Sequence, residues 1–192
     1  MVNLTRIYTR TGDDGSTALG DMSRTTKLDT RLVAYADVDE TNSSLGVAIA
    51  LGGLSPEVVA LLTRIQNDLF DVGADLCTPV VVAPEHPPLR VEQSYVDGLE
   101  SACDSWNESL QSLRSFVLPG GTAGAALLHV ARTVARRAER STWAALAEHG
   151  EAMNPLTATY LNRLSDLLFI LARVANVGAG GDILWQPGAN RS

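Results

Sequence analysis

The chain has 192 residues, a length typical of one domain, or of one domain with an extension, at about 150 residues per domain. Hydrophobic residues make up 45% and charged residues 19% of it, which indicates a globular protein with its own core rather than a disordered one. Acidic residues outnumber basic ones 22 to 15, giving a net charge of −7. This balance argues against a nucleic-acid partner, but it leaves room for a local basic patch that binds a smaller anion.

The sequence predicts a cytoplasmic protein without a membrane partner. No apolar run reaches the ~18 residues of a membrane span, and the N-terminus lacks the apolar segment of a secretory signal. The two cysteines, Cys77 and Cys103, are too few for a disulfide framework or a zinc site. We therefore expect two reduced thiols.

The first predicted elements are a loop and a helix. Residues 1–29 are rich in glycine, aspartate, serine and threonine, a composition typical of turns. From about Asp29 to Leu51, apolar residues recur at helical spacing. Two glycines, at positions 52 and 53, end this predicted helix.

Four more helices are predicted downstream. The second begins at Ser55 and Pro56, a favourable cap and first-turn residue, and the proline-rich segment 78–90 follows it. The remaining three are expected at about 91–114, 122–149 and 155–176, followed by a loose, flexible tail over 177–192. Only residues 80–82, three valines, resemble a strand. The expected fold class is therefore all-α, an antiparallel five-helix bundle.

The fourth predicted helix carries the strongest chemical signal. At about 100° per residue, one face collects Arg132, Arg136, Glu139 and Arg140, with His129 at its margin and Arg137 further round. The opposite face, with Leu128, Ala131, Ala135 and Ala138, is expected to point into the core. Neighbouring cations on a helix repel one another, so the row is either a solvated charged face or a site for phosphate or carboxylate.

The N-terminal loop is a second candidate. Residues 9–17 combine glycines, hydroxyls and Arg10, so that the main chain can approach a ligand and its N–H groups can cradle phosphate oxygens. Lys27 adds a point charge nearby. The segment is not a Walker A loop, and an ordinary polar loop is the alternative.

Two further clusters have open interpretations. Asn162, Asp166 and Arg173 lie on one stripe of the apolar fifth helix, either as an inter-helix hydrogen-bond network or with Asn162 facing a ligand pocket. The acidic run Asp37, Asp39 and Glu40 is a solvated turn, a partner for a helix-four arginine, or part of a metal site. The three histidines are too scattered for a convincing metal cluster, so we assign no metal ligand.

Seven segments taken together resemble one known family, the PduO-type ATP:cob(I)alamin adenosyltransferases. In chain order they are YTRTGDDGST (8–17), Lys27, YADVDETNSSLG (35–46), IQNDLFDVGADL (65–76), FVLPGG (116–121), ARTVARRAERS (131–141) and YLNRLSDLLFILAR (160–173). Each is modest alone, but the ordered set spans about residues 7–176 and is highly specific.

The resemblance implies one domain over 1–192 that forms a homotrimer with active sites between subunits. It implies an enzyme in which cob(I)alamin attacks C5′ of ATP, with Mg²⁺ on the phosphates, to give adenosylcobalamin and tripolyphosphate. A cobalamin reductase and an adenosylcobalamin-dependent mutase are the implied protein partners. The alternative is a non-catalytic bundle that binds ATP or adenosylcobalamin and delivers the cofactor to a client mutase.

The resemblance also implies roles for individual residues. Those implied for the nucleotide are Thr9, Arg10, Thr11, Gly12, Thr17, Ala18, Lys27, Arg136, Arg137, Glu139, Arg140 and Asn162. Asp39 and Arg132 match a pair that joins neighbouring subunits. Phe116 matches the aromatic residue that packs beside the corrin and displaces its lower nitrogen ligand. Asp14 departs from the pattern, because many members have a lysine there, and we leave it out of the site.

Overall fold

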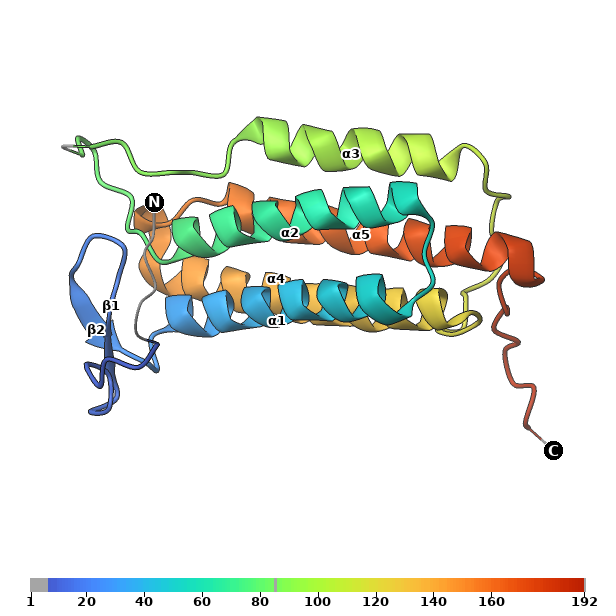
Figure 1. Cartoon of the computed structure of the whole chain (residues 1–192), viewed down its shortest axis with the longest axis horizontal. Coiled ribbons are helices and arrows are strands. Elements are labelled where there is room, and N and C mark those ends of the chain that lie inside the picture. Colours follow the sequence, from blue (N-terminus) through green and yellow to red (C-terminus); the bar gives the residue numbers. More distant parts are fainter. Residues whose placement is uncertain (1–6, 85, 192) are drawn as a thin grey trace.

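A computed structural model describes residues 7–84 and 86–191 and contains the five predicted helices (Figure 1). Their bounds are α1 Thr30–Leu51, α2 Pro56–Leu76, α3 Gln93–Asn107, α4 Ala123–His149 and α5 Leu156–Asn176. Consecutive helices run in opposite directions along a common axis. The expected all-α, antiparallel five-helix bundle is confirmed.

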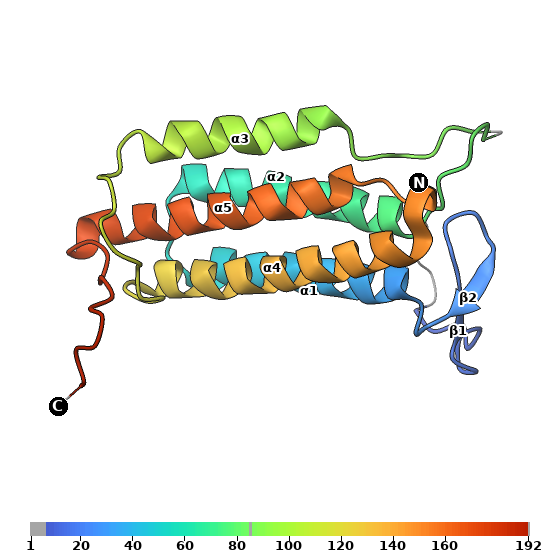
Figure 2. The ribbon, with the colours of Figure 1, turned by 180° about the vertical axis from the view of Figure 1, so that it is seen from behind.

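Helix α4 packs on both α1 and α5, while α3 packs mainly on α5 (Figure 2). The face of α4 expected to be buried is buried: Leu128, Ala131, Ala135 and Ala138 are all fully inaccessible. Small side chains let neighbouring helices approach closely. Larger residues of α2 and α5, among them Leu62, Ile65, Leu164 and Leu168, fill the remaining core.

The helix starts follow their capping residues. The side chains of Asp29, Ser55 and Thr122 each accept a hydrogen bond from a main-chain N–H in the first turn, which satisfies a group that the helix itself leaves unpaired. Helix α3 ends at Asn107 rather than at the predicted residue 114. Most residues of 108–114 are exposed, so little apolar burial stabilises a further turn there.

The segment 1–29, expected to be loop throughout, contains a small hairpin. Strands β1 Ser16–Ala18 and β2 Arg24–Thr26 pair in antiparallel register, with Thr17 opposite Thr25. The strands are short and polar, so they lack the apolar alternation that marks a strand in sequence. Leu19, at the hairpin loop, is buried, and the Gly20 N–H donates to the Cys77 carbonyl over 2.7 Å. Tertiary contacts therefore stabilise the hairpin.

The two other irregular segments also differ from expectation. The valines at 80–82 belong to no strand and are exposed. Tail residues 183–185 pair with 116–118 through a bridge between Val117 and Leu184, a contact that no sequence signal indicated. The residues that follow, up to 191, are exposed.

No helix in the described ranges is long and apolar enough to cross a membrane. Cys77 and Cys103 are both free thiols. Desolvation raises the pKa of each to about 11. Because the thiolate is the reactive form, neither sulfur is a nucleophile near neutral pH.

We predict that Leu164→Ala lowers the free energy of unfolding by about 2–5 kcal/mol, because it leaves a cavity in the core. Leu164 is fully buried. Leu51→Ala is the matched control, since Leu51 is 71% exposed and its truncation is expected to cost about 0.5 kcal/mol or less. Equal losses for the two variants in chemical denaturation would contradict this assignment of the core.

Candidate functional site

The outer face of α4 presents a row of arginines with few anions near them. Arg132 and Arg136 line a pocket of about 280 Å³ together with Asp166 and Phe169 of α5. The buried Nε of Arg132 has no hydrogen-bond partner within the described chain. Burial, and next the positive charge of Arg136, lower the pKa of Arg132. Among the described residues, no carboxylate forms an ion pair with Arg132 or Arg136, because Asp166 pairs with Arg163 instead.

His129, one turn before Arg132, is a buried residue rather than a surface one. It is 2% exposed, its ring lies edge-on to Phe169 at 6.1 Å, and neither ring nitrogen has a hydrogen-bond partner among the described residues. Desolvation and the charge of Arg132 lower its pKa. The imidazole is therefore neutral at pH 7 and adds no charge to the row.

Further along the same face, two predicted site residues meet. The Asn162 side chain on α5 donates a hydrogen bond to Glu139 Oε1 on α4 over 3.1 Å. Both side chains are half-buried. Asn162 is thus part of an inter-helix hydrogen bond, while Asp166 of the same stripe is exposed and pairs with Arg163 on its own helix. The Asn162 contact fixes the rotamer of Glu139 beside the arginines.

The acidic run on α1 pairs with an arginine of α4, as one of the three interpretations predicted. Arg137 forms ion pairs with Asp37 and with Glu40, and Ser141 donates to Asp37. No group of three or more potential metal-ligating side chains occurs in residues 7–84 and 86–191. Asp39, also on α1, is exposed and forms no hydrogen bond or ion pair with the described residues.

Arg136 and Arg140 differ from Arg137 in having no ion pair within the described part of the chain. Both are exposed, and neither is hydrogen-bonded or ion-paired within the described part of the chain. Arg137 has its charge balanced by α1, whereas these two guanidinium groups are free to bind an incoming anion. Guanidinium groups bind phosphate through paired hydrogen bonds.

The candidate nucleotide loop, residues 9–18, is folded against the hairpin. Thr9 and Thr11 share a hydrogen bond of 2.9 Å between their hydroxyls, and the Arg24 guanidinium donates to the Thr11 carbonyl. Arg10 has a left-handed backbone (φ 64°) and lies 5.7 Å above the Tyr8 ring. The loop exposes hydroxyls, main-chain groups and one cation together, a suitable set for a phosphate chain.

Space at position 12 is limited by Lys27 and Ser16. A Cβ at Gly12 would lie 3.2 Å from Lys27 Nζ and 3.0 Å from the Ser16 carbonyl oxygen. The Lys27 N–H in turn donates to the Gly15 carbonyl over 2.9 Å. The ammonium group therefore lies beside Gly12 of the loop, where a phosphate bound by the loop would meet it.

Asp14 has a local structural role. Its Oδ1 accepts hydrogen bonds from the Ser16 N–H and hydroxyl, at 2.9 Å and 2.6 Å. These bonds, from the hydroxyl first and the main chain second, lower the pKa of Asp14. Asp14 therefore stays ionised and shapes the turn, and it does not supply the positive charge of a lysine.

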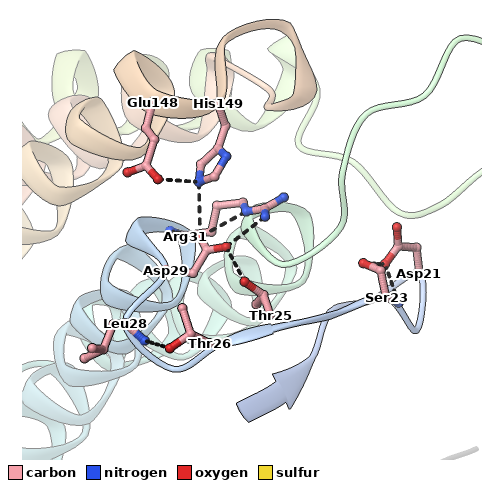
Figure 3. Close-up of polar contacts among 9 residues, drawn as sticks. All are labelled: Asp21, Ser23, Thr25, Thr26, Leu28, Asp29, Arg31, Glu148 and His149. Atoms are coloured by element: carbon pink, nitrogen blue, oxygen red, sulfur yellow. Dashed lines mark hydrogen bonds and ion pairs between the residues drawn. The ribbon is translucent and has the colours of Figure 1, made fainter. Parts of the chain in front are cut away.

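Asp29 anchors the hairpin to the bundle (Figure 3). Its carboxylate accepts bonds from the Arg31 guanidinium (2.9 Å) and from the Thr25 hydroxyl of β2 (2.8 Å), and lies 3.1 Å from His149 Nε2 at the end of α4. The Arg31 side chain, more than any other group, holds the pKa of Asp29 well below its usual range. The sequence marked Asp29 only as the place where a helix begins, because its partners come from distant segments.

The segment before α4, which carries Phe116, lies at the opposite end of the bundle (Figure 1). Phe116 is 77% exposed, and its ring lies 5.9 Å from that of Trp185 in the tail. Close by, a hollow of about 1030 Å³ is lined by the loop 109–114, Arg173 and tail residues 180–182. An exposed aromatic ring beside a hollow of this size is a suitable surface for a large flat ligand.

The predicted site residues therefore fall into groups that one copy of the chain does not unite. The loop 9–18 stands at the end of α4 where His149 lies, and Phe116 precedes the start of that helix. Helix α4 has 27 residues, which corresponds to about 40 Å at ~1.5 Å per residue. The arginine row lies between these two ends.

We predict that Asp29→Asn lowers the free energy of unfolding at pH 7. A carboxylate whose pKa is depressed by folding stabilises the folded state above the unfolded pKa of about 4, and this contribution is lost as the pH falls toward the folded value. The gap between the unfolding free energies of wild type and variant should therefore narrow as the pH falls, measured by denaturation from pH 7 to 3. The exposed Asp104→Asn on α3 is the control, and a gap independent of pH would contradict the prediction.

Comparisons with known proteins identify the family of this chain. A family model described as cobalamin adenosyltransferase matches residues 7–175. A corrinoid adenosyltransferase of Mycobacterium tuberculosis is 63% identical over 191 residues, covering 100% of this chain and 98% of the relative, and one of Bacillus subtilis is 38% identical, covering 96% and 94%. A variant PduO-type ATP:corrinoid adenosyltransferase from Lactobacillus reuteri, solved with cobalamin and ATP, matches with a TM-score of 0.86 at 35% identity, covering 95% of this chain and 97% of that one. The chain belongs to the cobalamin adenosyltransferase family.

Proposed function

We propose that this chain transfers the 5′-deoxyadenosyl group of ATP to the cobalt of cob(I)alamin. Cobalt(I) supplies the electron pair of the new Co–C bond. The bond between C5′ and its oxygen breaks, and tripolyphosphate leaves with the electron pair of that broken bond. The chain belongs to the cobalamin adenosyltransferase family. Within this family member, the observation that supports the proposal is the row of arginines on α4. Arg136 and Arg140 have no partner among the described residues, and the leaving group is a polyanion.

In this reaction the protein supplies position and charge. The nucleophile is the metal of the substrate, so no side chain has to act as a base. The loop 9–18 and Lys27 would hold the phosphates, while Arg136 and Arg140 would stabilise the negative charge that grows on the leaving oxygen. Glu139, which accepts a hydrogen bond from Asn162, would orient the nucleotide. Arg137 lies beside Glu139 on α4 and would also contact the nucleotide.

Mg²⁺ would arrive as part of the nucleotide substrate. The described residues contain no cluster of three metal-ligating side chains, whereas a triphosphate offers several oxygen ligands of the kind that Mg²⁺ prefers. The arginines and Lys27 would then neutralise the charge that the cation leaves uncompensated.

The active site would be completed by a second copy of the chain in a homotrimer. Arg132 has a buried Nε without a partner in the described chain, and Asp39 is an exposed carboxylate without one. An ion pair between Arg132 of one copy and Asp39 of the next would satisfy both groups. It would also bring the loop 9–18 of one copy toward the arginine row of another.

A second candidate function is delivery of adenosylcobalamin to a client mutase, with a cobalamin reductase supplying the reduced substrate. The exposed Phe116 and the adjoining hollow favour corrin binding whichever function applies. Synthesis is tested by incubating the chain with ATP and chemically reduced cob(I)alamin, and identifying both products. Adenosylcobalamin with an equivalent of tripolyphosphate is expected. Tight cobalamin binding without product would favour delivery alone.

We predict that Arg136→Ala lowers kcat by an amount equal to about 2–4 kcal/mol of transition-state stabilisation. Arg136→Lys is expected to retain part of the rate, because it keeps the charge but not the paired hydrogen bonds. Arg64→Ala, at an exposed position of α2, is the matched control and should leave the kinetics as they are. Wild-type turnover by Arg136→Ala would remove this residue from the site.

We predict that Phe116→Ala impairs turnover from cob(II)alamin with a reductant more than turnover from pre-reduced cob(I)alamin. The expected role of the ring is to displace the lower nitrogen ligand, which makes cob(II)alamin easier to reduce. The two rates, measured at saturating ATP, give the comparison. Equal losses with both substrates would contradict the role proposed for Phe116.

A further inference from the structure

Two buried polar residues and one half-buried carboxylate meet where α5 ends. Arg173 and Asn176 belong to the last turn of α5 and are 8% and 1% exposed, while Asp182 lies in the tail. Arg173 Nε donates to Asp182 Oδ2 over 2.8 Å, and Asn176 Nδ2 donates to Asp182 Oδ1 over 3.3 Å. Both oxygens of this carboxylate are thus bound by α5. A buried guanidinium depends on such a partner, because an unpaired charge there is costly.

The same two residues of α5 also hold the segment that carries Phe116, once on each side of it. Before Phe116, Arg173 Nη2 donates to the Gln111 carbonyl over 2.7 Å. After it, Asn176 donates to the Gly120 carbonyl over 3.1 Å and accepts from the Thr122 N–H over 3.0 Å. The segment between residues 111 and 122 is therefore fixed at both ends by one turn of helix.

The approach of this segment to Asn176 is close. Gly121 has a φ of +104°, and a Cβ there would lie 2.2 Å from Asn176 Oδ1. Only glycine fits both this backbone conformation and this space. The turn after Phe116 is thus shaped around the Asn176 side chain.

The tail supports the middle of the segment. The Leu118 N–H donates to the Ile183 carbonyl, and the Trp185 N–H donates to the Phe116 carbonyl, each over 2.8 Å. These bonds begin at the residue that follows Asp182. Phe116 itself is largely exposed, so core packing does not fix its ring, and its position depends on these main-chain bonds and on Trp185.

We propose that Asp182, through Arg173 and Asn176, is a positioning residue that holds the Phe116 ring where it acts on the corrin. The inference rests on the proposed function and adds residues that do not touch the substrate. Without the Asp182 charge, Arg173 loses its partner and turns toward water, which releases the Gln111 carbonyl and the tail together. The Phe116 ring is then still present, but it is no longer held in the position from which it acts on the corrin.

The test compares Asp182→Asn, Asp182→Glu and wild type with bound cob(II)alamin. Electron paramagnetic resonance reports whether the lower nitrogen still coordinates cobalt, through the splitting that this nitrogen causes. In Asp182→Asn we expect more of the bound cob(II)alamin to keep its nitrogen, and turnover from cob(II)alamin to fall roughly 10-fold, as for a misplaced group. Asp182→Glu keeps the negative charge and should therefore recover part of the nitrogen displacement and part of the turnover. The Kd for ATP should stay at its wild-type value.

Two further variants separate positioning from loss of stability. In a Phe116→Ala background, Asp182→Asn should add no further loss, because the ring it positions is absent. Asp75→Asn is the matched control, since it breaks another buried ion pair, with Arg90 at 2.5 Å, far from Phe116. It should lower the melting temperature but leave the cobalt spectrum unchanged. If Asp182→Asn fails to fold, Arg173→Lys provides the same comparison.

The inference is overturned if folded Asp182→Asn shows the wild-type spectrum, or if it still lowers turnover in the Phe116→Ala background. Absence of product from wild type with pre-reduced cob(I)alamin would instead contradict the proposed function. Hydrogen exchange at the Leu118 and Trp185 amides is independent of activity. Faster exchange in Asp182→Asn than in Asp75→Asn is expected. Equal exchange would contradict the clamp, by which we mean the contacts of Arg173, Asn176 and Asp182 that hold the segment 111–122.

Discussion

The constraint on which the rest of the structure depends is the division of α4 into two faces. One face consists of small residues, among them Ala131, Ala135 and Ala138, which are fully buried between α1 and α5. The other carries Arg132, Arg136 and Arg140. Because the alanines fix the rotation of the helix about its axis, the arginines have to lie side by side at its outer surface, where like charges repel. The folded chain therefore presents positive charge that a polyanion would stabilise.

A second constraint is the distance between the loop 9–18 and Phe116, two groups that the proposed reaction requires in one active site. The candidate nucleotide loop, residues 9–18, stands beyond the end of α4 where His149 lies, and the segment that carries Phe116 lies beyond the start of α4 (Figures 1 and 2). Each group is anchored by buried polar contacts, Asp29 at one end and Arg173 with Asp182 at the other. Because both ends are anchored, one copy of the chain cannot bring the loop 9–18 and Phe116 together. A second copy, held by an ion pair between Asp39 and Arg132, would supply the missing group.

The sequence predicted the elements that depend on local patterns. Helical periodicity, N-caps and the buried alanine face of α4 follow from spacing that any single segment displays. What it did not predict depends on contacts between distant segments: the polar hairpin held by Leu19 and Gly20, the early end of α3, and the pairing of the tail with residues 116–118. The candidate site shows the same division. The arginine row was visible as a pattern, whereas the pairing of Arg137 with Asp37 and Glu40 was one of several interpretations. Of Arg173, Asn176 and Asp182, the sequence singled out only Arg173, as part of a polar stripe, because the partners that these residues hold come from distant segments.

The central claim is that one active site requires residues from two copies of the chain. Arg136 lies thirteen residues before His149 on α4, about 20 Å along the helix from the loop. The most direct measurement is subunit complementation: Arg10→Ala and Arg136→Ala are each purified, then unfolded and refolded together. If the loop and the arginine row of one site come from different copies, mixed assemblies contain some sites with both groups intact. Adenosylcobalamin synthesis in the mixture should then clearly exceed the sum of the two variants alone. Activity that never rises above that sum, in mixed assemblies shown to contain both chains, would contradict the account.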